Sequence, residues 1–245
     1  MALAHYKIIL SYNGSEFAGF QRQRDARTIQ GEFEASLRKM GWQGKSILSA
    51  GRTDAGVHAA GQVVSFQMNW VHSVEDLRNA LNYYLPNDIA VKSVSLVKAE
   101  FHPRFDAKAR HYRYHVFCQP IRDPIREIFA WRVWPPVEIG VMNVAAGKLI
   151  GSHDFKAFGS ATSAGGATIR EIFSNAWQEH GDAYQLDIIA NAFLYHMVRR
   201  ITFILVAIGQ GDAPPNLIDE SLFSGEIRLT GLAPAEGLVL KEVVY

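Results

Sequence analysis

The chain of 245 residues is poor in cysteine, and its single one, Cys118, excludes an internal disulfide or a zinc site built from several cysteines. Its longest apolar run, 201–208, ends at Gly209. That is far short of the roughly 18–20 residues that a membrane-spanning helix needs. The N-terminus lacks the charge, apolar core and cleavage site of a secretory signal. These absences predict a soluble protein of the reducing cytoplasm, with no membrane partner.

The chain also lacks a large excess of charge of one sign, since its formal net charge is only +1. The distribution is nevertheless uneven. Residues 1–132 carry 18 Lys and Arg against 12 Asp and Glu, whereas residues 133–245 carry 7 against 12. A basic half favours a polyanionic partner, although an uneven surface without any partner would have the same composition. The length is that of one large or two small domains, and the 48% of hydrophobic residues suffices for a sizeable core.

Residue patterns in the first half follow the order β-α-β-β-α-β. They predict a strand at 7–12, a helix after Thr28, strands at 46–50 and 62–66, a helix after Ser73 and a strand at 89–97. Asn13-Gly14 is a tight-turn signal after the first strand. Thr28 suits a helix N-cap, and Ser73 to Asp76 resembles a capping box. The order is that of the split ferredoxin-like motif.

The second half repeats this order more loosely. It predicts a strand at 112–117, a helix at 141–149, strands at 169–179 and 184–190, a long helix at 193–209 and a strand at 237–244. We therefore expect an α+β protein of two ferredoxin-like (RRM-like) halves, with adjoining, mainly antiparallel sheets and helices on one side. The expected domains are 1–100 and 101–245.

The loop at 49–59 carries the most informative residues. Gly51 and Gly56 bracket a triplet that ends in Asp54, so the backbone can bend sharply on both sides of this carboxylate. A carboxylate on a rigid loop can act as a nucleophile or accept a proton. A purely structural turn, with Asp54 bonded to its own backbone or paired with Arg52, explains the same residues.

An arginine lies within the otherwise apolar and aromatic stretch 193–201. Arg199 follows Tyr195 by four residues and His196 by three, which places all three on nearby faces of the predicted helix. A guanidinium in such surroundings needs a partner and would keep a neighbouring carboxylate ionised. The alternative is that Arg199 and Arg200 mark an exposed stripe.

Basic and aromatic residues alternate over 101–114, where four Lys or Arg and two His are mixed with four aromatic rings. Cations for phosphates and rings for bases are typical of binding to unstacked nucleic acid. On a strand, Tyr112 and Tyr114 share one face while His111 and Arg113 share the other. A sheet edge with a basic face is the structural alternative. The small, polar stretch 159–166 suits a substrate-contacting loop or a flexible connection.

Other chemistries have little support. No glycine-rich phosphate-binding motif is present. His111 and His115 would lie about 13 Å apart on a strand, too far for one metal ion. The sequence therefore predicts neither a metal nor a nucleotide cofactor.

Several segments resemble the tRNA pseudouridine synthase A family, in the family's own order and over nearly the whole chain. The most specific is GRTDAGVHA at 51–59. The others are FHPRF at 101–105, ARHYRY at 109–114, HDF at 153–155 and FLYHMVR at 193–199.

This resemblance implies an enzyme that converts uridine to pseudouridine at positions 38, 39 and 40 of the tRNA anticodon stem-loop. It implies no cofactor, a homodimer with a cleft shared between subunits, and a target nucleotide that is flipped out of its stack.

The resemblance also implies roles for individual residues. Asp54 matches the catalytic aspartate, Tyr112 the tyrosine that stacks on the target base, and Arg199 the arginine that pairs with the aspartate. Arg52 matches an arginine linked to extruding the nucleotide. Further tRNA contacts are expected at Phe101, His102, Pro103, Arg104, Phe105, Thr162, Ser163, Ala164, Gly165 and Gly166.

Two other functions compete with this hypothesis. A catalytically silent RNA-binding module of two RRM-like halves would bind tRNA without changing it, but the usual RRM aromatic-glycine motif is absent. A hydrolase would cleave the glycosidic bond and release free uracil, but no second carboxylate stands near Asp54 in the sequence.

Overall fold

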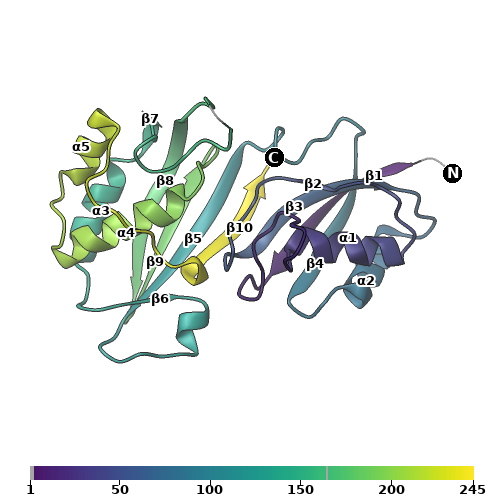
Figure 1. Cartoon of the computed structure of the whole chain (residues 1–245), viewed down its shortest axis with the longest axis horizontal. Helices are drawn as coiled ribbons and strands as arrows, with labels where there is room; N and C mark the ends of the chain where they lie inside the picture. Colours follow the sequence, from purple (N-terminus) through teal and green to yellow (C-terminus); the bar gives the residue numbers. More distant parts are fainter. Residues whose placement is uncertain (1–2, 164) are drawn as a thin grey trace. The chain divides into compact units, whose positions relative to one another are not determined.

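A computed structural model describes residues 3–163 and 165–245 (Figure 1). The chain forms two compact units. Unit 1 comprises Met1–Lys108 and Leu240–Tyr245, and unit 2 comprises Ala109–Val239. Unit 1 is therefore discontinuous, because the chain returns to it only after unit 2. The predicted α+β class with mainly antiparallel strands is confirmed.

Unit 1 has the predicted ferredoxin-like order. Its elements are β1 (Ala4–Tyr12), α1 (Ile29–Lys39), β2 (Leu48–Ser49), β3 (His58–Met68), α2 (Val74–Tyr84) and β4 (Ile89–Val97). The strand β1 lies between β4 and β3 and is antiparallel to both, and β2 pairs with β3. Figure 1 shows α1 and α2 on the same face of this sheet. The β1 side chains Ile8 and Leu10 are fully buried.

Local signals in unit 1 act as predicted. The Thr28 hydroxyl accepts a hydrogen bond from the Gly31 N–H at 3.2 Å, which caps α1. Ser73 and Asp76 form a reciprocal capping box at the start of α2. Each bond satisfies a backbone N–H that has no partner inside the helix. These caps fix where the two helices begin.

A buried carboxylate anchors α1. Glu34 is 0% exposed and accepts hydrogen bonds from the Ile47 N–H at 3.1 Å and the Gln30 amide at 2.9 Å. It also forms ion pairs with Arg22 and Arg38. A buried charge is tolerated only with such partners. Arg22, part of a basic loop in the sequence, thus has a structural partner.

Removing this carboxylate is expected to destabilise the fold. Glu34→Ala leaves the Ile47 N–H and the Gln30 amide without their acceptor, so the free energy of unfolding should fall by about 3 kcal/mol. Urea unfolding followed by circular dichroism measures the change. Glu100→Ala, which removes an exposed carboxylate of the same unit, should change it by about 0.5 kcal/mol or less. Equal effects of the two substitutions would contradict the anchoring role.

The strands of unit 2 are mainly antiparallel as well. Its elements are β5 (Ala109–Cys118), β6 (Trp131–Val133), α3 (Ile139–Gly147), β7 (Gly151–Asp154), β8 (Ile169–His180), β9 (Ala183–Ala190), α4 (Met197–Gln210), α5 (Leu217–Ser224) and the first residues of β10 (Leu238–Val244). The strands lie in the order β5-β9-β8-β7, and the short β6 runs parallel to β5. The helix α3 packs against both β8 and α4.

The long helix predicted at 193–209 is wrong at its start. Residues 193–196 are not helical, because Tyr195 exchanges two backbone hydrogen bonds with Ser160 at 2.9 and 3.3 Å. His196 then takes a left-handed conformation with φ of +64°, and α4 begins at Met197. Tyr195 and His196 therefore do not share a helical face with Arg199. The elements β6, β7 and α5 were not predicted either.

Candidate active site

Asp54 lies in the loop between β2 and β3 of unit 1, as predicted. It is half-buried, Arg52 before it is exposed, and Thr53 is buried. The carbonyl of Asp54 accepts the Val57 N–H at 3.2 Å, and Gly56 bends the backbone with a φ of +79°. The loop is thus a tight turn that holds a partly accessible carboxylate. It combines the structural and the functional interpretation of the sequence.

The segment 14–20 is hydrogen-bonded to this loop. The Phe20 N–H donates to the Thr53 carbonyl at 3.0 Å, and the Gly56 N–H donates to the Phe17 carbonyl at 3.3 Å. These bonds lie on both sides of Asp54 in the sequence. Backbone contacts therefore fix the loop before and after the carboxylate.

Two glycines permit this close approach. A Cβ on Gly14 would lie 2.1 Å from the Val57 carbonyl oxygen, and one on Gly19 would lie 3.0 Å from that of Thr53. Gly19 also has a φ of +94°. The Asn13-Gly14 pair indeed marks a turn, in which the Asn13 side chain accepts the Ser15 N–H at 3.1 Å. The glycine, however, is required for proximity to Val57 rather than for a positive φ.

A buried polar cluster lies behind the loop. The hydroxyls of Tyr12 and Thr53 are 2.8 Å apart, and the Gln62 amide donates to the Gly51 carbonyl at 3.1 Å. Nδ1 of His58 accepts the Gly14 N–H at 3.0 Å. Burial raises the pKa of Tyr12 to about 12, so its hydroxyl stays protonated at neutral pH. Sequence analysis missed these supporting residues, because their contacts span 41 and 44 positions for Tyr12–Thr53 and Gly14–His58.

Residues 101–105, which begin the basic and aromatic segment, form a turn in unit 1 that is held by Tyr245. Phe101 packs on Tyr245 with ring centroids 5.2 Å apart, and the Tyr245 hydroxyl donates to the Pro103 carbonyl at 2.8 Å. The Lys7 ammonium lies 5.3 Å from the centroid of the Tyr245 ring. Phe101 is thus half-buried and Pro103 buried, and their contacts with Tyr245 support the turn.

Two other residues of this turn, Arg104 and Phe105, face outward. Phe105 is 76% exposed and stacks on the ring of His102 at a centroid distance of 4.3 Å. The Arg104 guanidinium lies 6.0 Å from the centre of the Phe105 ring. Nδ1 of His102 accepts the Arg104 N–H at 3.1 Å and holds the turn. The surface therefore offers an ordered aromatic ring beside a cation.

The predicted alternation along β5 in unit 2 is confirmed. His111 and Arg113 lie on one face, where both contact the carboxylate of Asp187, at 2.6 and 2.9 Å. Burial acts to raise the pKa of Asp187, but the bonds from Arg113 and His111 outweigh it, and the net shift is downward. Tyr112 has its ring 5.2 Å from that of Phe193, edge to face. The Asp187 carboxylate thus partly neutralises the basic face of β5, and Tyr112 lies on the other face.

Arg199 lies in the first turn of α4 and is only partly exposed. Its Nε donates to the Ala233 carbonyl at 2.8 Å, and its own carbonyl accepts the Ala233 N–H at 3.2 Å. Nearby, the fully buried Tyr114 donates to the Pro234 carbonyl at 2.7 Å. Burial raises the pKa of Tyr114 well above its usual value, and the charge of Arg199 acts in the opposite direction. The guanidinium is therefore fixed by the chain at 233–234 and is not part of an exposed stripe.

The predicted loop at 162–166 belongs to unit 2. Thr162, Ser163 and Gly165 are exposed, and the Gly166 N–H donates to the Ser163 carbonyl at 3.1 Å. Ala164 lies outside the described residues. The loop follows Ser160, whose bonds to Tyr195 tie it to the chain immediately before α4.

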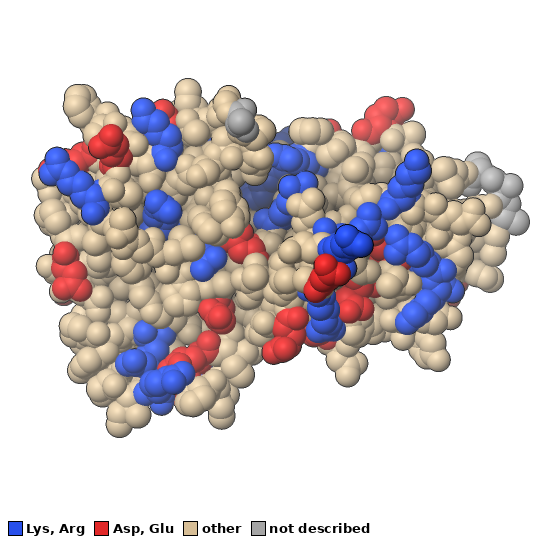
Figure 2. Space-filling view, viewed as in Figure 1, with Lys and Arg blue, Asp and Glu red and all other residues tan. Residues whose placement is uncertain are grey.

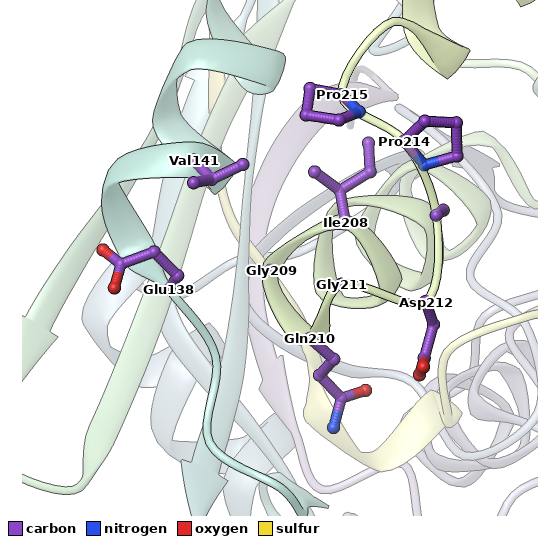
Figure 3. A pocket seen from close by; sticks show the side chains of 10 residues that line it. Glu138, Val141, Ile208, Gly209, Gln210, Gly211, Asp212, Pro214 and Pro215 are labelled. Atoms are coloured by element: carbon purple, nitrogen blue, oxygen red, sulfur yellow. The ribbon is translucent and has the colours of Figure 1, made fainter.

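A separate pocket lies at the start of α3 and the end of α4, with a volume of about 630 Å³ (Figure 3). Glu138, Val141 and residues 208–215 line it. None of the predicted site residues is among them, so this pocket is not the candidate site. Within residues 3–163 and 165–245, no cluster of His, Cys, Asp and Glu could hold a metal ion. Among the same residues, no helix has the length and hydropathy to cross a bilayer.

On the face in Figure 2, basic and acidic side chains are interspersed. Ion pairs such as Arg27–Asp88 and Arg126–Asp182 are spread over both units. Part of the excess positive charge of residues 1–132 is therefore neutralised by carboxylates of the same chain. Cations at particular positions, rather than the total charge, have to account for any polyanion binding.

Comparison with known proteins gives one consistent result. The sequence profile of a family described as tRNA pseudouridine synthase matches residues 8–106 and 145–245. A tRNA pseudouridine synthase A of Geobacillus kaustophilus is 41% identical over 242 residues, 98% of this chain and 93% of the relative. One of Geotalea uraniireducens is 37% identical over 240 residues, 98% of both chains. One of Myxococcus xanthus is 39% identical over 241 residues, 98% of this chain and 91% of the relative.

Proposed function

Because the chain belongs to the tRNA pseudouridine synthase A family, we propose that it isomerises uridine to pseudouridine at positions 38, 39 and 40 of the tRNA anticodon stem-loop. The family fixes the reaction, which is uridine isomerisation in tRNA. The observation that carries the assignment to this chain is the rigid loop that presents Asp54. The target positions follow from the resemblance of the motif at 51–59 to the family's own.

Asp54, Tyr112 and Arg199 are the proposed catalytic residues. The reaction breaks the N1–C1′ bond of uridine, rotates the detached uracil, joins C5 to C1′ and releases the C5 proton. A carboxylate can act at the sugar or the ring, and a guanidinium can stabilise the charge that develops. The Tyr112 ring offers a surface on which the base can stack, and its hydroxyl is a candidate acceptor for the C5 proton.

The target uridine lies in a stem or at its end, so we propose that it is flipped out before it reacts. Unstacking costs a few kcal/mol. Stacking on Tyr112 and insertion of the exposed Arg52 side chain can offset this cost. Arg52 is long, charged and adjacent to the rigid part of the loop, which suits it to occupy the space that the base leaves.

We propose the turn of Phe101, His102, Pro103, Arg104 and Phe105 as a tRNA contact. Its outward side chains are those of Arg104 and Phe105. Both are exposed, and the turn beneath them is fixed by His102 and Tyr245. The ring can stack on an unpaired base and the guanidinium can bind a phosphate. Thr162, Ser163, Gly165 and Gly166 are proposed as a second contact, together with Ala164 from the sequence alone.

Replacing Arg104 tests the electrostatic part of this proposal. The affinity of the chain for tRNA should fall linearly with salt on a double-logarithmic plot, and Arg104→Ala should reduce the slope by about 1. Filter binding from 50 to 300 mM KCl measures both slopes. Arg122→Ala removes an exposed arginine that is paired with Glu127, and it should leave the slope unchanged. A wild-type slope for Arg104→Ala would contradict the phosphate contact.

We also propose that the chain acts as a homodimer in the cytoplasm, as the family resemblance implies. Sedimentation equilibrium at micromolar concentration tests the assembly directly. A mass of twice the 27.3 kDa of the chain supports the dimer. A mass equal to that of one chain would overturn it.

Mapping pseudouridine in tRNA tests the function itself. Unmodified tRNA transcripts with uridine at 38, 39 and 40 are incubated with the chain, treated with carbodiimide and read by reverse transcription. Stops at these positions are expected, and none in transcripts with cytidine there. Stops only elsewhere would overturn the positions. Binding without stops would support the silent RNA-binding module, and free uracil would support the hydrolase.

A further inference from the structure

A buried hydrogen bond joins β1 directly to the loop of Asp54. The hydroxyls of Tyr12 and Thr53 are 2.8 Å apart, and the two residues are only 4% and 6% exposed. Tyr12 is the last residue of β1, a strand with partners on both sides, and Thr53 immediately precedes Asp54. The bond therefore connects the residue before the carboxylate to a rigid part of unit 1.

Gln62 contacts the same hydroxyl pair. Its Oε1 accepts the Val63 N–H at 3.1 Å, so its Nε2 is the donor to the Gly51 carbonyl at 3.1 Å and to the Tyr12 hydroxyl at 3.5 Å. The Tyr12 oxygen accepts from this amide, and either hydroxyl of the Tyr12–Thr53 pair can donate to the other. Burial raises the pKa of Tyr12 to about 12, so its hydroxyl keeps its hydrogen throughout the neutral range.

The main chain of Thr53 is fixed as well. Its carbonyl accepts the Phe20 N–H at 3.0 Å and lies against Gly19. On the other side of Asp54, the Val57 N–H donates to the Asp54 carbonyl at 3.2 Å. With its neighbours held on both sides, Asp54 has little backbone freedom, and the Tyr12–Thr53 bond adds a side-chain contact to those that hold Thr53.

We infer that the Tyr12–Thr53 hydroxyl pair positions Asp54 for the reaction, an inference that rests on the proposed role of Asp54. A reacting group must be held within about 0.5 Å of its productive position, and a displacement of about 1 Å can cost about 100-fold in rate. Both hydroxyls act through Asp54 and do not touch the uridine. They are positioning residues whose removal affects turnover rather than binding.

Substitutions at Thr53 separate this role from packing. Thr53→Val replaces the hydroxyl with a methyl group of similar size, and we expect kcat for tritium release from [5-³H]uridine tRNA to fall about 10- to 100-fold. KM for tRNA should stay unchanged. Thr53→Ser keeps the hydroxyl and should restore kcat to within about 3-fold of the wild type. All assays are run well below the unfolding temperature of each variant.

Tyr12→Phe and the double variant with Thr53→Val test whether the two hydroxyls act together. Tyr12→Phe should lower kcat like Thr53→Val, and the double variant should be no slower than the slower single variant, because both remove the same bond. Tyr6→Phe makes the same change at another buried tyrosine of β1 and should leave kcat unchanged. A wild-type kcat in Thr53→Val, additive losses, or an equal loss in Tyr6→Phe would overturn the inference. An inactive wild type would instead overturn the proposed function.

Discussion

Asp54→Asn is expected to lower the rate of tritium release from tRNA carrying [5-³H]uridine by about 10³- to 10⁴-fold. Asparagine keeps the size of the side chain and the Val57–Asp54 backbone bond of the turn. It lacks the negative charge that attack or proton removal requires. Affinity for tRNA should stay within about 3-fold of the wild type, because the tRNA contacts that we propose lie at other residues. Single-turnover kinetics at saturating enzyme separates the two effects.

The matched control is Asp212→Asn, which changes an exposed aspartate outside the candidate site. It should leave both rate and affinity unchanged. A wild-type rate in Asp54→Asn would remove Asp54 from the mechanism. A loss of affinity as large as the loss of rate would make Asp54 a binding residue instead.

Gly14→Ala should impair both the stability of the fold and the reaction. The new Cβ would lie 2.1 Å from the Val57 carbonyl oxygen and 2.5 Å from its carbon, so the backbone of one segment must move. We expect the free energy of unfolding to fall by about 3 kcal/mol, at the upper end of overpacking effects. Because Val57 lies three residues after Asp54, kcat should also fall about 100-fold or more in the protein that remains folded. Urea unfolding and tritium release measure the two changes.

Gly147→Ala provides the comparison. It lies in the last turn of α3, and a Cβ there meets nothing within 4 Å. Alanine favours the helix by up to about 1 kcal/mol, so stability should stay equal or rise, with unchanged activity. Full stability and activity in Gly14→Ala would mean that segment 14–20 does not support the Asp54 loop.

Local signals explain what the sequence predicts well. The hydroxyls of Thr28 and Ser73 cap helices through bonds to residues three positions away, and such contacts are visible in any short stretch of sequence. The alternation at 111–114 depends only on the period of a strand. The carboxylate of Asp54 between two glycines is equally local.

Contacts between distant segments explain the parts of the structure that the sequence does not predict. Residues 193–196 have a helical spacing of apolar side chains, yet they are not helical, because Tyr195 pairs with Ser160. A backbone bond of that kind carries no side-chain signal. The short strands β6 and β7 depend in the same way on neighbours that the local pattern does not reveal.

The turn at 101–105 illustrates the same limit within the site. All five residues match the family motif, but Phe101 and Pro103 are held by Tyr245 while Arg104 and Phe105 face outward. The contact between Pro103 and Tyr245 spans 142 positions. The motif does not distinguish the residues that support the turn from those that face outward, and only the fold separates the two groups.

The discontinuity of unit 1 has a consequence for biosynthesis. Leu240–Tyr245 belong to unit 1 but leave the ribosome after all of Ala109–Val239. A nascent chain that has exposed only its first 108 residues lacks the tyrosine that closes the turn at Phe101 and Pro103. Domains usually fold in the order in which they are synthesised. Here the earlier unit gains its final strand only when translation has passed the later one, so its turn at 101–105 is completed last.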